Sequence, residues 1–485
     1  ATATVRLILH PSEIKEEMTV TGQTPLIDVS SSSFTTDFTS RFMEDLPTDR
    51  NFFDLMAVSM GISLNGSNGH HLNAFGSDVG SNNWLTDGIE VSAPETGSRF
   101  LSFNPDTIEE IQVMGVGAPA EFGQLQGAAL NVVTKRGSNE LRGSLNAYWF
   151  NESLVDSEIE FDRSEFSEFE QVEPFADVSA TLGGSIRKDR LWYFVAYENW
   201  RNGLATPGQD PTTVNTRKVD RYDAKLSGRI NDRNLLDLRV GLEEFTWPGN
   251  ANEFVEPSAR WSEDGEIPYW ALSFQSIFSD RTFLEARYAG WQSEISYLSQ
   301  TGSTEPAYID FAPPDGGPAR YSGGVWWPVI WETGSDQFSA TVSHFADDFL
   351  KGDHDFKLGA QLSRGNGRDS VSPSATGSYY FHTYYSYYRV DGYPYYSGNE
   401  QESWAFFADD SWAVTDRLTL NLGLRFDHAE GIIPSYPILE PDGDPTGTTA
   451  PGLDSAFTWD NWSPRFGFAY NLGADRRTVL RGAIG

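Results

Sequence analysis

Alternation of apolar and polar residues over long segments is the feature that most restricts how this chain can fold. In the segment 418–426 (LTLNLGLRF) every even position is apolar and every odd position is polar or glycine. The same period of two occurs in segments 222–230, 236–242, 338–342 and 466–470. This period is that of a β-strand with one apolar face. The chain from residue 139 onward is therefore predicted to consist mainly of two-faced strands.

The length of these segments distinguishes two kinds of β protein. We count about thirteen of them, many at least about ten residues long, whereas strands of soluble proteins average about five or six residues. A strand that crosses a bilayer needs about 9–11 residues. The segment lengths therefore favour a membrane β-barrel.

The connections between the segments alternate in length. Short polar turns are predicted at 188–189, 231–233, 279–281, 347–353, 415–417 and 473–476. Long connections are predicted at roughly 152–174, 203–217, 247–266, 298–332, 366–400 and 428–460. Outer-membrane barrels have short periplasmic turns at one rim and long external loops at the other. The alternative is a large soluble β protein such as a propeller, but the sequence has no repeat of about 40–50 residues with a blade signature.

The composition excludes several functions. The 35 basic and 69 acidic residues give a net charge of −34, whereas proteins that bind the phosphate backbone depend on basic side chains. Nucleic acid is therefore not expected as a partner. The absence of cysteine excludes disulfides, thiolate catalysis and cysteine-based zinc sites. Since we find no catalytic triad, phosphate-binding loop or carboxylate pair, we expect neither an enzyme nor a cofactor.

Residues 1–138 have a different pattern, with short mixed elements joined by glycine-rich connections. Two short helices are predicted at 40–46 and 51–57, and strands at 110–114 and 129–134. The pattern indicates a separate domain that contains both helices and strands.

Five sequence blocks in this domain resemble, in order and spacing, the plug domain of TonB-dependent outer-membrane receptors. They are 46–51, 83–90, 104–113, 120–127 and 131–139, and their motif positions are Arg50, Asn51, Asp87, Gly88, Glu121, Gly123 and Gly127. The variety most similar to this chain is the Oar-like one, which carries a carboxypeptidase-regulatory-like β domain ahead of the plug. One departure is Ala128, where many relatives have a second glycine.

The resemblance implies a fold class and a domain order. The expected fold is a membrane all-β protein, a large antiparallel transmembrane β-barrel with an N-terminal α+β plug domain in its lumen, in the cell outer membrane of a Gram-negative-type bacterium. The expected domains are the tail of the β domain (1–15), a TonB-box-like segment (16–22), the plug (23–138) and the barrel (139–485). Because barrels of this family close with 22 strands, we expect about nine further strands, and an intact protein heavier by about 25 kDa.

The segment Glu17, Met18, Thr19, Val20 and Thr21 resembles the TonB box. Alternating apolar and β-branched residues suit an extended peptide that adds a strand to a partner's sheet. The implied partner is a TonB-like energy-transducing protein in the periplasm, while the barrel surface is expected to contact outer-membrane lipid. An ordinary linker strand is the alternative interpretation of this segment.

Aromatic residues are concentrated in two predicted external loops. Nine tyrosines lie between 379 and 396, among them Tyr384, Tyr385, Tyr387 and Tyr388, and the preceding loop carries Trp326, Trp327 and Trp331. Such side chains combine a flat apolar face with a polar group and have few rotatable bonds, which suits them to binding an extracellular ligand. An interface girdle or packing within the loops is the alternative.

No metal site is expected. The adjacent histidines at 70–71 are interpreted as solvated loop residues. The pair at 442 and 444 lacks the spacing of a calcium loop and is interpreted as a polar turn.

Together these features predict plug-gated, TonB-dependent active transport of an unidentified ligand across the outer membrane. The alternative is a non-transporting surface protein that uses the same fold for adhesion or assembly, since fold alone does not fix function. Uptake that depends on the proton-motive force would distinguish the two. The charge of −34 argues against a strongly anionic ligand.

Overall fold

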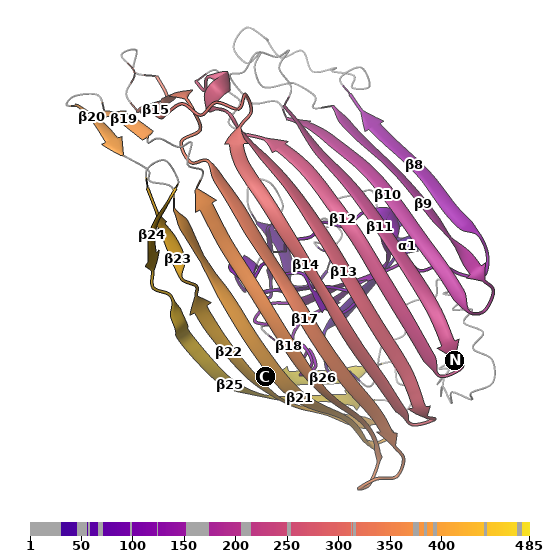
Figure 1. The fold of residues 1–485 in the computed structure, drawn as a ribbon. Helices are drawn as coiled ribbons and strands as arrows, with labels where there is room; N and C mark the ends of the chain where they lie inside the picture. Colours follow the sequence, from indigo (N-terminus) through magenta and orange to yellow (C-terminus); the bar gives the residue numbers. More distant parts are fainter. Residues whose placement is uncertain are drawn as a thin grey trace.

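A computed structural model gives the fold, and long antiparallel strands dominate it (Figure 1). It describes residues 31–45, 56, 59–65, 71–97, 99–123, 125–151, 174–204, 215–249, 254–311, 313, 317–371, 378–382, 386–390, 395–440, 444–472 and 478–485. Within these ranges, no helix is both long enough and apolar enough to span a membrane.

Thirteen strands form one antiparallel sheet, which we call the wall. Its strand order is β26-β25-β22-β21-β18-β17-β14-β13-β12-β11-β10-β9-β8. Its strands are β8 (Arg142–Phe150), β9 (Phe175–Arg187), β10 (Leu191–Leu204), β11 (Asn215–Asn231), β12 (Asn234–Pro248), β13 (Trp261–Ser279), β14 (Thr282–Ser299), β17 (Val329–Ala346), β18 (Asp353–Val371), β21 (Tyr396–Thr415), β22 (Leu418–Ile433), β25 (Leu453–Asn471) and β26 (Val479–Ile484). The wall curves like a trough, with β8 and β26 at its two edges (Figure 1). The predicted strand number and antiparallel arrangement are confirmed, and the thirteen strands do not close into a barrel.

Short and long connections alternate along the wall, as predicted. Three long connections contain small strands, β15 (Ala307–Asp310), β16 (Arg320–Gly323), β19 (Ser378–His382), β20 (Ser386–Val390), β23 (Tyr436–Leu439) and β24 (Pro445–Ala450), and a fourth contains the turn η4 (Pro257–Ala259). The loop predicted at 366–400 is too wide, because β18 continues to Val371 and β21 begins at Tyr396. The outer ends of these strands are polar on both faces, so their hydropathy does not alternate although backbone pairing continues.

The wall has an apolar outward face. Seven residues on neighbouring strands are successive register partners, and each is between 37% and 52% exposed. They are Leu226, Leu238, Leu272, Tyr288, Phe338, Leu362 and Trp404. A continuous exposed row of this kind is the surface that an outer-membrane barrel presents to lipid.

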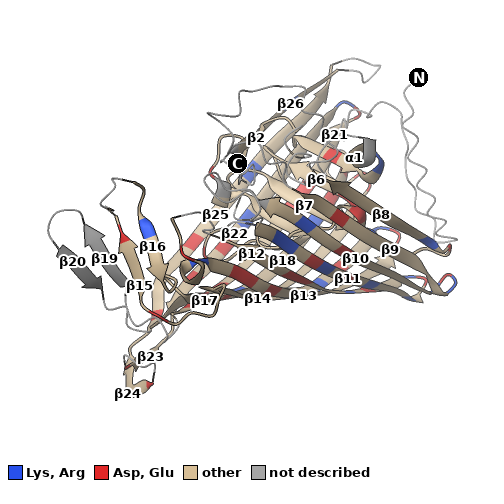
Figure 2. Cartoon of the chain, turned by 90° about the horizontal axis from the view of Figure 1, so that it is seen from above, with Lys and Arg blue, Asp and Glu red and all other residues tan. Residues whose placement is uncertain are grey.

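A row of acidic residues crosses the same face nearer the long connections. Asp220, Glu244, Glu266, Glu294 and Glu332 are successive register partners, and Arg368 ends the row in an ion pair with Glu332. Figure 2 shows acidic segments on neighbouring wall strands. Because carboxylates are costly in hydrocarbon, the row marks the water side of the lipid-facing surface.

A separate α+β domain lies inside the curve of the wall (Figure 1). This domain, residues 31–134, is called the plug below. It contains β1 (Thr35–Thr39), α1 (Ser40–Asp45), β2 (Ile62–Asn65), β3 (His71–Ala74), η1 (Val79–Ser81), β4 (Asn83–Thr86), β5 (Ile89–Glu90), η2 (Pro105–Thr107), β6 (Ile108–Met114) and β7 (Ala129–Thr134). The strand order of its main sheet is β1-β6-β7-β4-β5.

The plug and the wall share one apolar core. Ile111 and Leu130 of the plug belong to the same buried cluster as Ile267, Trp291 and Ile295 of the wall. The predicted helix at 40–46 and the two predicted plug strands correspond to α1, β6 and β7. The helix predicted at 51–57 lies outside the described residues, apart from position 56.

Neutralising the middle of the acidic row should stabilise the protein. In Glu266→Gln, two like-charge contacts with the flanking glutamates are removed, and like charges directly opposite on neighbouring strands are destabilising. We expect a gain of about 0.2–1 kcal/mol at low salt, which shrinks at high salt because exposed charges are screened. Unfolding of the protein in detergent micelles measures it.

The control for this experiment is Glu305→Gln, which changes the net charge equally at an exposed position outside the row. An equal effect of both substitutions, or a loss of stability in Glu266→Gln, would contradict the prediction.

Candidate functional site

The β4–β5 hairpin carries the first contact between plug and wall. Thr86 and Ile89 pair across a two-residue turn of Asp87 and Gly88, which have φ values of 49° and 77°. Two positive φ values are those of a type I′ turn, for which Asp-Gly is a preferred sequence. A Cβ atom on Gly88 would also lie 2.5 Å from the Arg287 guanidinium of β14. The backbone conformation therefore favours glycine here, and a side chain at this position would also displace the end of the Arg287 side chain.

The Asp87 carboxylate binds two cations of the wall. It accepts hydrogen bonds from the Thr134 backbone N–H (2.9 Å) and hydroxyl (2.7 Å) within the plug. Lys225 Nζ of β11 lies 3.3 Å from it, and Arg239 of β12 lies 3.6 Å away. Arg239 also donates to the Thr86 hydroxyl (2.8 Å). We call this cluster the Asp87 latch.

The groups around Asp87 keep its carboxylate ionised. Burial disfavours the ionised carboxylate, but Lys225, Arg239 and the hydrogen bonds from Thr134 outweigh it and hold the pKa of Asp87 below its usual range. The carboxylate of Asp223 accepts a hydrogen bond from the Arg239 guanidinium at 2.6 Å and so holds it in position. The latch is therefore fully formed above the ordinary carboxyl pKa and is lost only as the pH falls through the depressed value.

The second contact holds the plug loop 118–123 by its backbone. Arg425 of β22 donates to the carbonyl oxygens of Ala120 (3.2 Å) and Glu121 (3.1 Å). Arg465 of β25 donates to the carbonyl of Ala118 at 2.8 Å. Since the acceptors are main-chain atoms, the loop is held largely independently of its side chains. We call this cluster the loop latch.

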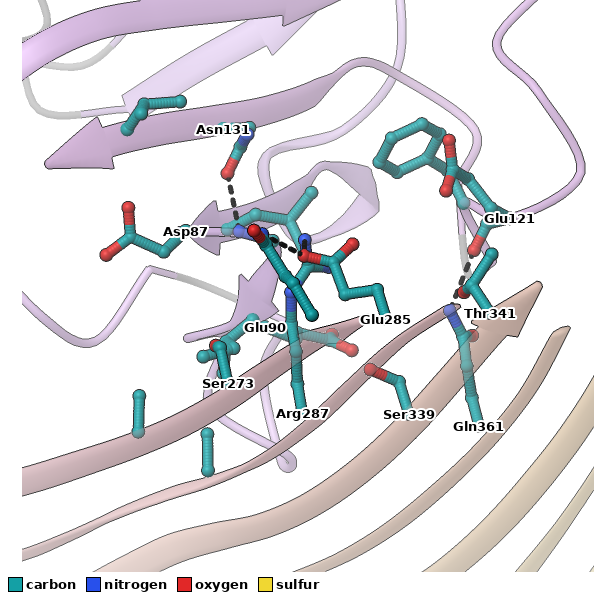
Figure 3. Close-up of a pocket in the computed structure, with 18 of the residues that line it drawn as sticks. Asp87, Glu90, Glu121, Asn131, Ser273, Glu285, Arg287, Ser339, Thr341 and Gln361 are labelled. Carbon is teal, nitrogen blue, oxygen red and sulfur yellow. Dashed lines mark hydrogen bonds and ion pairs between the residues drawn. The ribbon is translucent and has the colours of Figure 1, made fainter. Parts of the chain in front are cut away.

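Three further wall residues complete the loop latch. The Glu121 carboxylate pairs with Lys357, and its carbonyl accepts from Gln361 at 2.9 Å (Figure 3). The Asp409 carboxylate accepts a hydrogen bond from the backbone N–H of Ala120 at 2.9 Å. A Cβ atom on Gly123 would overlap the guanidinium of Arg425, which explains the glycine at that motif position.

The remaining predicted plug positions differ in what the structure shows. Gly127 lies beside Asn82, whose side-chain oxygen accepts a hydrogen bond from the backbone N–H of Ala128 at 3.1 Å. Arg50, Asn51 and the TonB-box-like segment 17–21 lie outside the described residues. The proposed coupling role of that segment therefore stays a prediction.

The aromatic candidates do not form one group. Trp331 was predicted to lie in a loop, but it lies on β17. Its Nε1 atom lies 3.3 Å from Glu95 of the plug, and its ring contacts Phe100 edge-on at 5.6 Å, so it packs against the plug. The strand continues past the point where its sequence stops alternating. Trp326 and Trp327 do lie in the long connection, with ring centroids 6.2 Å apart.

The tyrosine candidates lie farther along the chain. Tyr387 and Tyr388 are on β20, and Tyr384 and Tyr385 fall outside the described residues. Over the described part of the chain, no three His, Asp or Glu side chains are grouped to hold a metal ion. Positions 70 and 442 also lie outside it.

Asp87 and Glu121, on the plug side of the two latches, are motif positions of the sequence, whereas no sequence pattern pointed to the residues on the wall side. The missed residues are Lys225, Arg239, Lys357, Arg425 and Arg465. Their common signal is a basic residue at an odd position of a strand whose even positions face lipid. In a chain with twice as many acidic as basic residues, inward-facing cations on successive strands would have been a usable clue.

A curved wall with an apolar outer face and a latched α+β domain within it defines the class of plugged outer-membrane barrels. Residues 205–485 match the family described as outer membrane beta barrel domain. This match covers more than half of the chain, so the chain belongs to that family and is an outer-membrane protein.

A curated relative is similar to part of the chain. Over 279 residues the chain is 27% identical to the TonB-dependent transporter Oar of Myxococcus xanthus, an alignment that covers 55% of this chain and 25% of the relative. The resemblance to Oar-like TonB-dependent receptors is thereby confirmed, except for the type of the N-terminal domain. The chain spans about a quarter of the length of this relative.

Solved structures share the fold. The outer membrane transporter YddB from Escherichia coli superimposes with a TM-score of 0.66 at 12% identity, covering 90% of this chain and 67% of its own. The ferric citrate transporter FecA in its unliganded form gives 0.64 at 14% identity, covering 92% and 61%. Identities this low establish the fold alone. All three named proteins are transporters, which agrees with the expectation that the chain is not an enzyme.

Removing the charge of Asp87 should loosen the plug. In Asp87→Asn, Lys225 and Arg239 face a neutral amide, and a hydrogen bond to a charged group contributes about 1.5–3 kcal/mol. We therefore expect the backbone amides of β4, β5 and β7 to exchange hydrogen faster, by the factor that corresponds to this lost free energy. In the unmodified protein, acidification should release this protection only below about pH 4, because the pKa of Asp87 is depressed.

Asp232→Asn is the matched control, because Asp232 lies exposed in the short turn between β11 and β12. If both variants exchanged at the same rate in β4, β5 and β7, the latch would not hold the plug.

Proposed function

We propose that the chain is the plug-bearing part of a TonB-dependent transporter that imports a solute across the outer membrane. The observation that carries this proposal is the position of the plug, which lies within the curve of the wall and is bonded to it at separate places by polar contacts. A domain that occupies a lumen and is held in this way can serve as a gate.

The topology of the plug supports opening by a pull at its N-terminal side. Among the described strands, β1 lies at the edge of the plug sheet and pairs with β6. The segment 16–22 precedes β1 in the chain, so a force on it reaches β1 first. The Asp87 latch lies at the opposite edge of the sheet, on the β4–β5 hairpin. A pull would therefore detach an edge strand before it loads the latch.

The partners follow from the same proposal. A TonB-like protein would pair with residues 17–21 by strand addition. The ligand would be captured on the external side, where Trp326 and Trp327 are 47% and 43% exposed.

Deleting residues 17–21 should abolish energised uptake and leave ligand binding at the cell surface intact, because a pulling handle is not part of a binding pocket. Uptake and binding of the labelled ligand by whole cells measure both properties. A deletion of equal length at residues 2–6 is the control. A correctly folded variant that no longer bound the ligand would count against the coupling role.

A protonophore separates transport from the alternative function. Transport should stop when the proton-motive force collapses, while surface binding continues. Adhesion or assembly without any energised uptake would instead support a non-transporting surface protein.

A further inference from the structure

The turn between β17 and β18 differs from the other short turns of the wall. The short turns lie along one rim of the wall (Figure 1), which in an outer-membrane barrel is the periplasmic rim. This turn comprises residues 347–352 and includes Phe349 and Leu350, which are 48% and 70% exposed. Four other short turns contain charged residues only, and they are 188–190, 232–233, 280–281 and 416–417. Two exposed apolar side chains therefore distinguish the β17–β18 turn from its neighbours.

The Phe349 ring lies over the outward face of the wall. It contacts the rings of His354 and Phe356 edge-on, with ring centroids 5.5 Å and 6.1 Å away. Side chains alternate along a strand, so these two even positions of β18 share the outward face with Leu362 of the exposed apolar row. Lys357, between them and the row, faces the plug. The turn therefore folds toward the lipid side of the wall and not toward the plug.

His354 gives the turn a fixed base. Its side chain is 4% exposed, and its ring stacks on the rings of Phe356 at 5.1 Å and of Trp412 at 5.2 Å. Its Nδ1 atom also lies 2.8 Å from the Asp410 carboxylate, which is a hydrogen-bonding distance. A ring that is covered on both faces and bonded at its edge has little freedom to move. Phe349 therefore packs against a rigid surface.

The backbone of the turn has an uncommon conformation. Asp348, Leu350 and Lys351 have φ values of 49°, 47° and 70°, in the left-handed region that residues other than glycine seldom adopt. Such conformations persist where surrounding contacts fix them, and they are frequent in segments that contact ligands. Here the Asp348 backbone N–H donates to the Asp353 carboxylate at 3.2 Å. The apolar tip is therefore presented in a defined geometry.

Charged residues on the outward face give the depth of the turn in the membrane. Asp336 of β17 accepts a hydrogen bond from Tyr288 of the exposed row at 3.1 Å, and its register partner Arg364 has a side chain that is 63% exposed. Because charges are costly in hydrocarbon, these residues mark the external limit of the apolar band on β17 and β18.

The length of β17 then places the turn. Asp336 and Ala346 are ten positions apart on this strand, which is about 33 Å along the strand and about 23–27 Å across the membrane at a tilt of about 35–45°. The apolar band of an outer-membrane barrel is about 25 Å tall. The turn that follows Ala346 therefore lies at the periplasmic edge of the band.

We propose that the β17–β18 turn is a membrane anchor, which inserts Phe349 and Leu350 at the boundary between the headgroups and acyl chains of phospholipids in the periplasmic leaflet. Its tip continues the lipid-facing surface through Phe356 and Leu358, which is 55% exposed. The exposed Lys351 side chain beside the tip extends its ammonium group toward the headgroups. This role does not depend on the proposed transport function.

The strands that carry the anchor also hold the plug. Lys357 of β18 and Asp409 of β21 belong to the loop latch. Each is next in sequence to a residue that surrounds or bonds His354 on the outward face, namely Phe356 and Asp410. The anchor therefore fixes, relative to the membrane, the part of the wall to which the plug loop is bonded.

A spin label on a single cysteine tests the anchor, because the chain has no cysteine of its own. Leu350→Cys places the nitroxide at the tip of the turn, and Asp280→Cys places it on the neighbouring turn 280–281 as the matched control. The full-length protein is reconstituted in vesicles of phosphatidylethanolamine and phosphatidylglycerol. Collisions of the label with oxygen, which partitions into lipid, are compared with collisions with a water-soluble nickel chelate.

We expect the ratio of oxygen to nickel collisions to be about fivefold higher for Leu350→Cys than for Asp280→Cys, because apolar groups at this boundary lie about 5–10 Å inside it. Equal ratios for the two labels would place the tip in water and overturn the proposal. A Leu350→Cys label that is shielded from the nickel chelate only after a periplasmic extract is added would also overturn it, in favour of a protein partner.

Discussion

Backbone hydrogen bonding in a bilayer is the constraint on which the rest of this structure depends. Lipid offers no partner to a peptide N–H or C=O group, so the segments that cross it must pair with one another. Strands β9 to β25 of the wall are 13 to 20 residues long and satisfy this requirement along their length. Because successive side chains of a strand point to opposite faces, each wall strand has one face toward lipid and one toward the plug. In β11, Leu226 faces lipid while its neighbour Lys225 faces the plug.

The inward environment explains the chemistry of both latches. A charged side chain that is largely removed from water needs a charged or strongly polar partner. Lys225 and Arg239 find the carboxylate of Asp87, whereas Arg425 and Arg465 find carbonyl oxygens of the loop 118–123. The plug is thus held at two places by contacts that depend on the wall's cations.

These two places also organise the proposed movement. β1 lies at the edge of the plug sheet that is farthest from the Asp87 latch. In the proposed movement, a pull on the N-terminal side would act on β1 before it acts on the Asp87 latch.

The sequence by itself determined the long strands of the wall, their approximate number and their two faces, because each follows from a local period. It did not determine the outer strand ends or the place of Trp331 on β17, since residues polar on both faces can pair without alternating. Only the tertiary structure decided which wall residues contact Asp87 and the loop 118–123. Those partners are 138 to 347 positions away, and such contacts are set by how the plug seats in the curved wall, which no local pattern encodes.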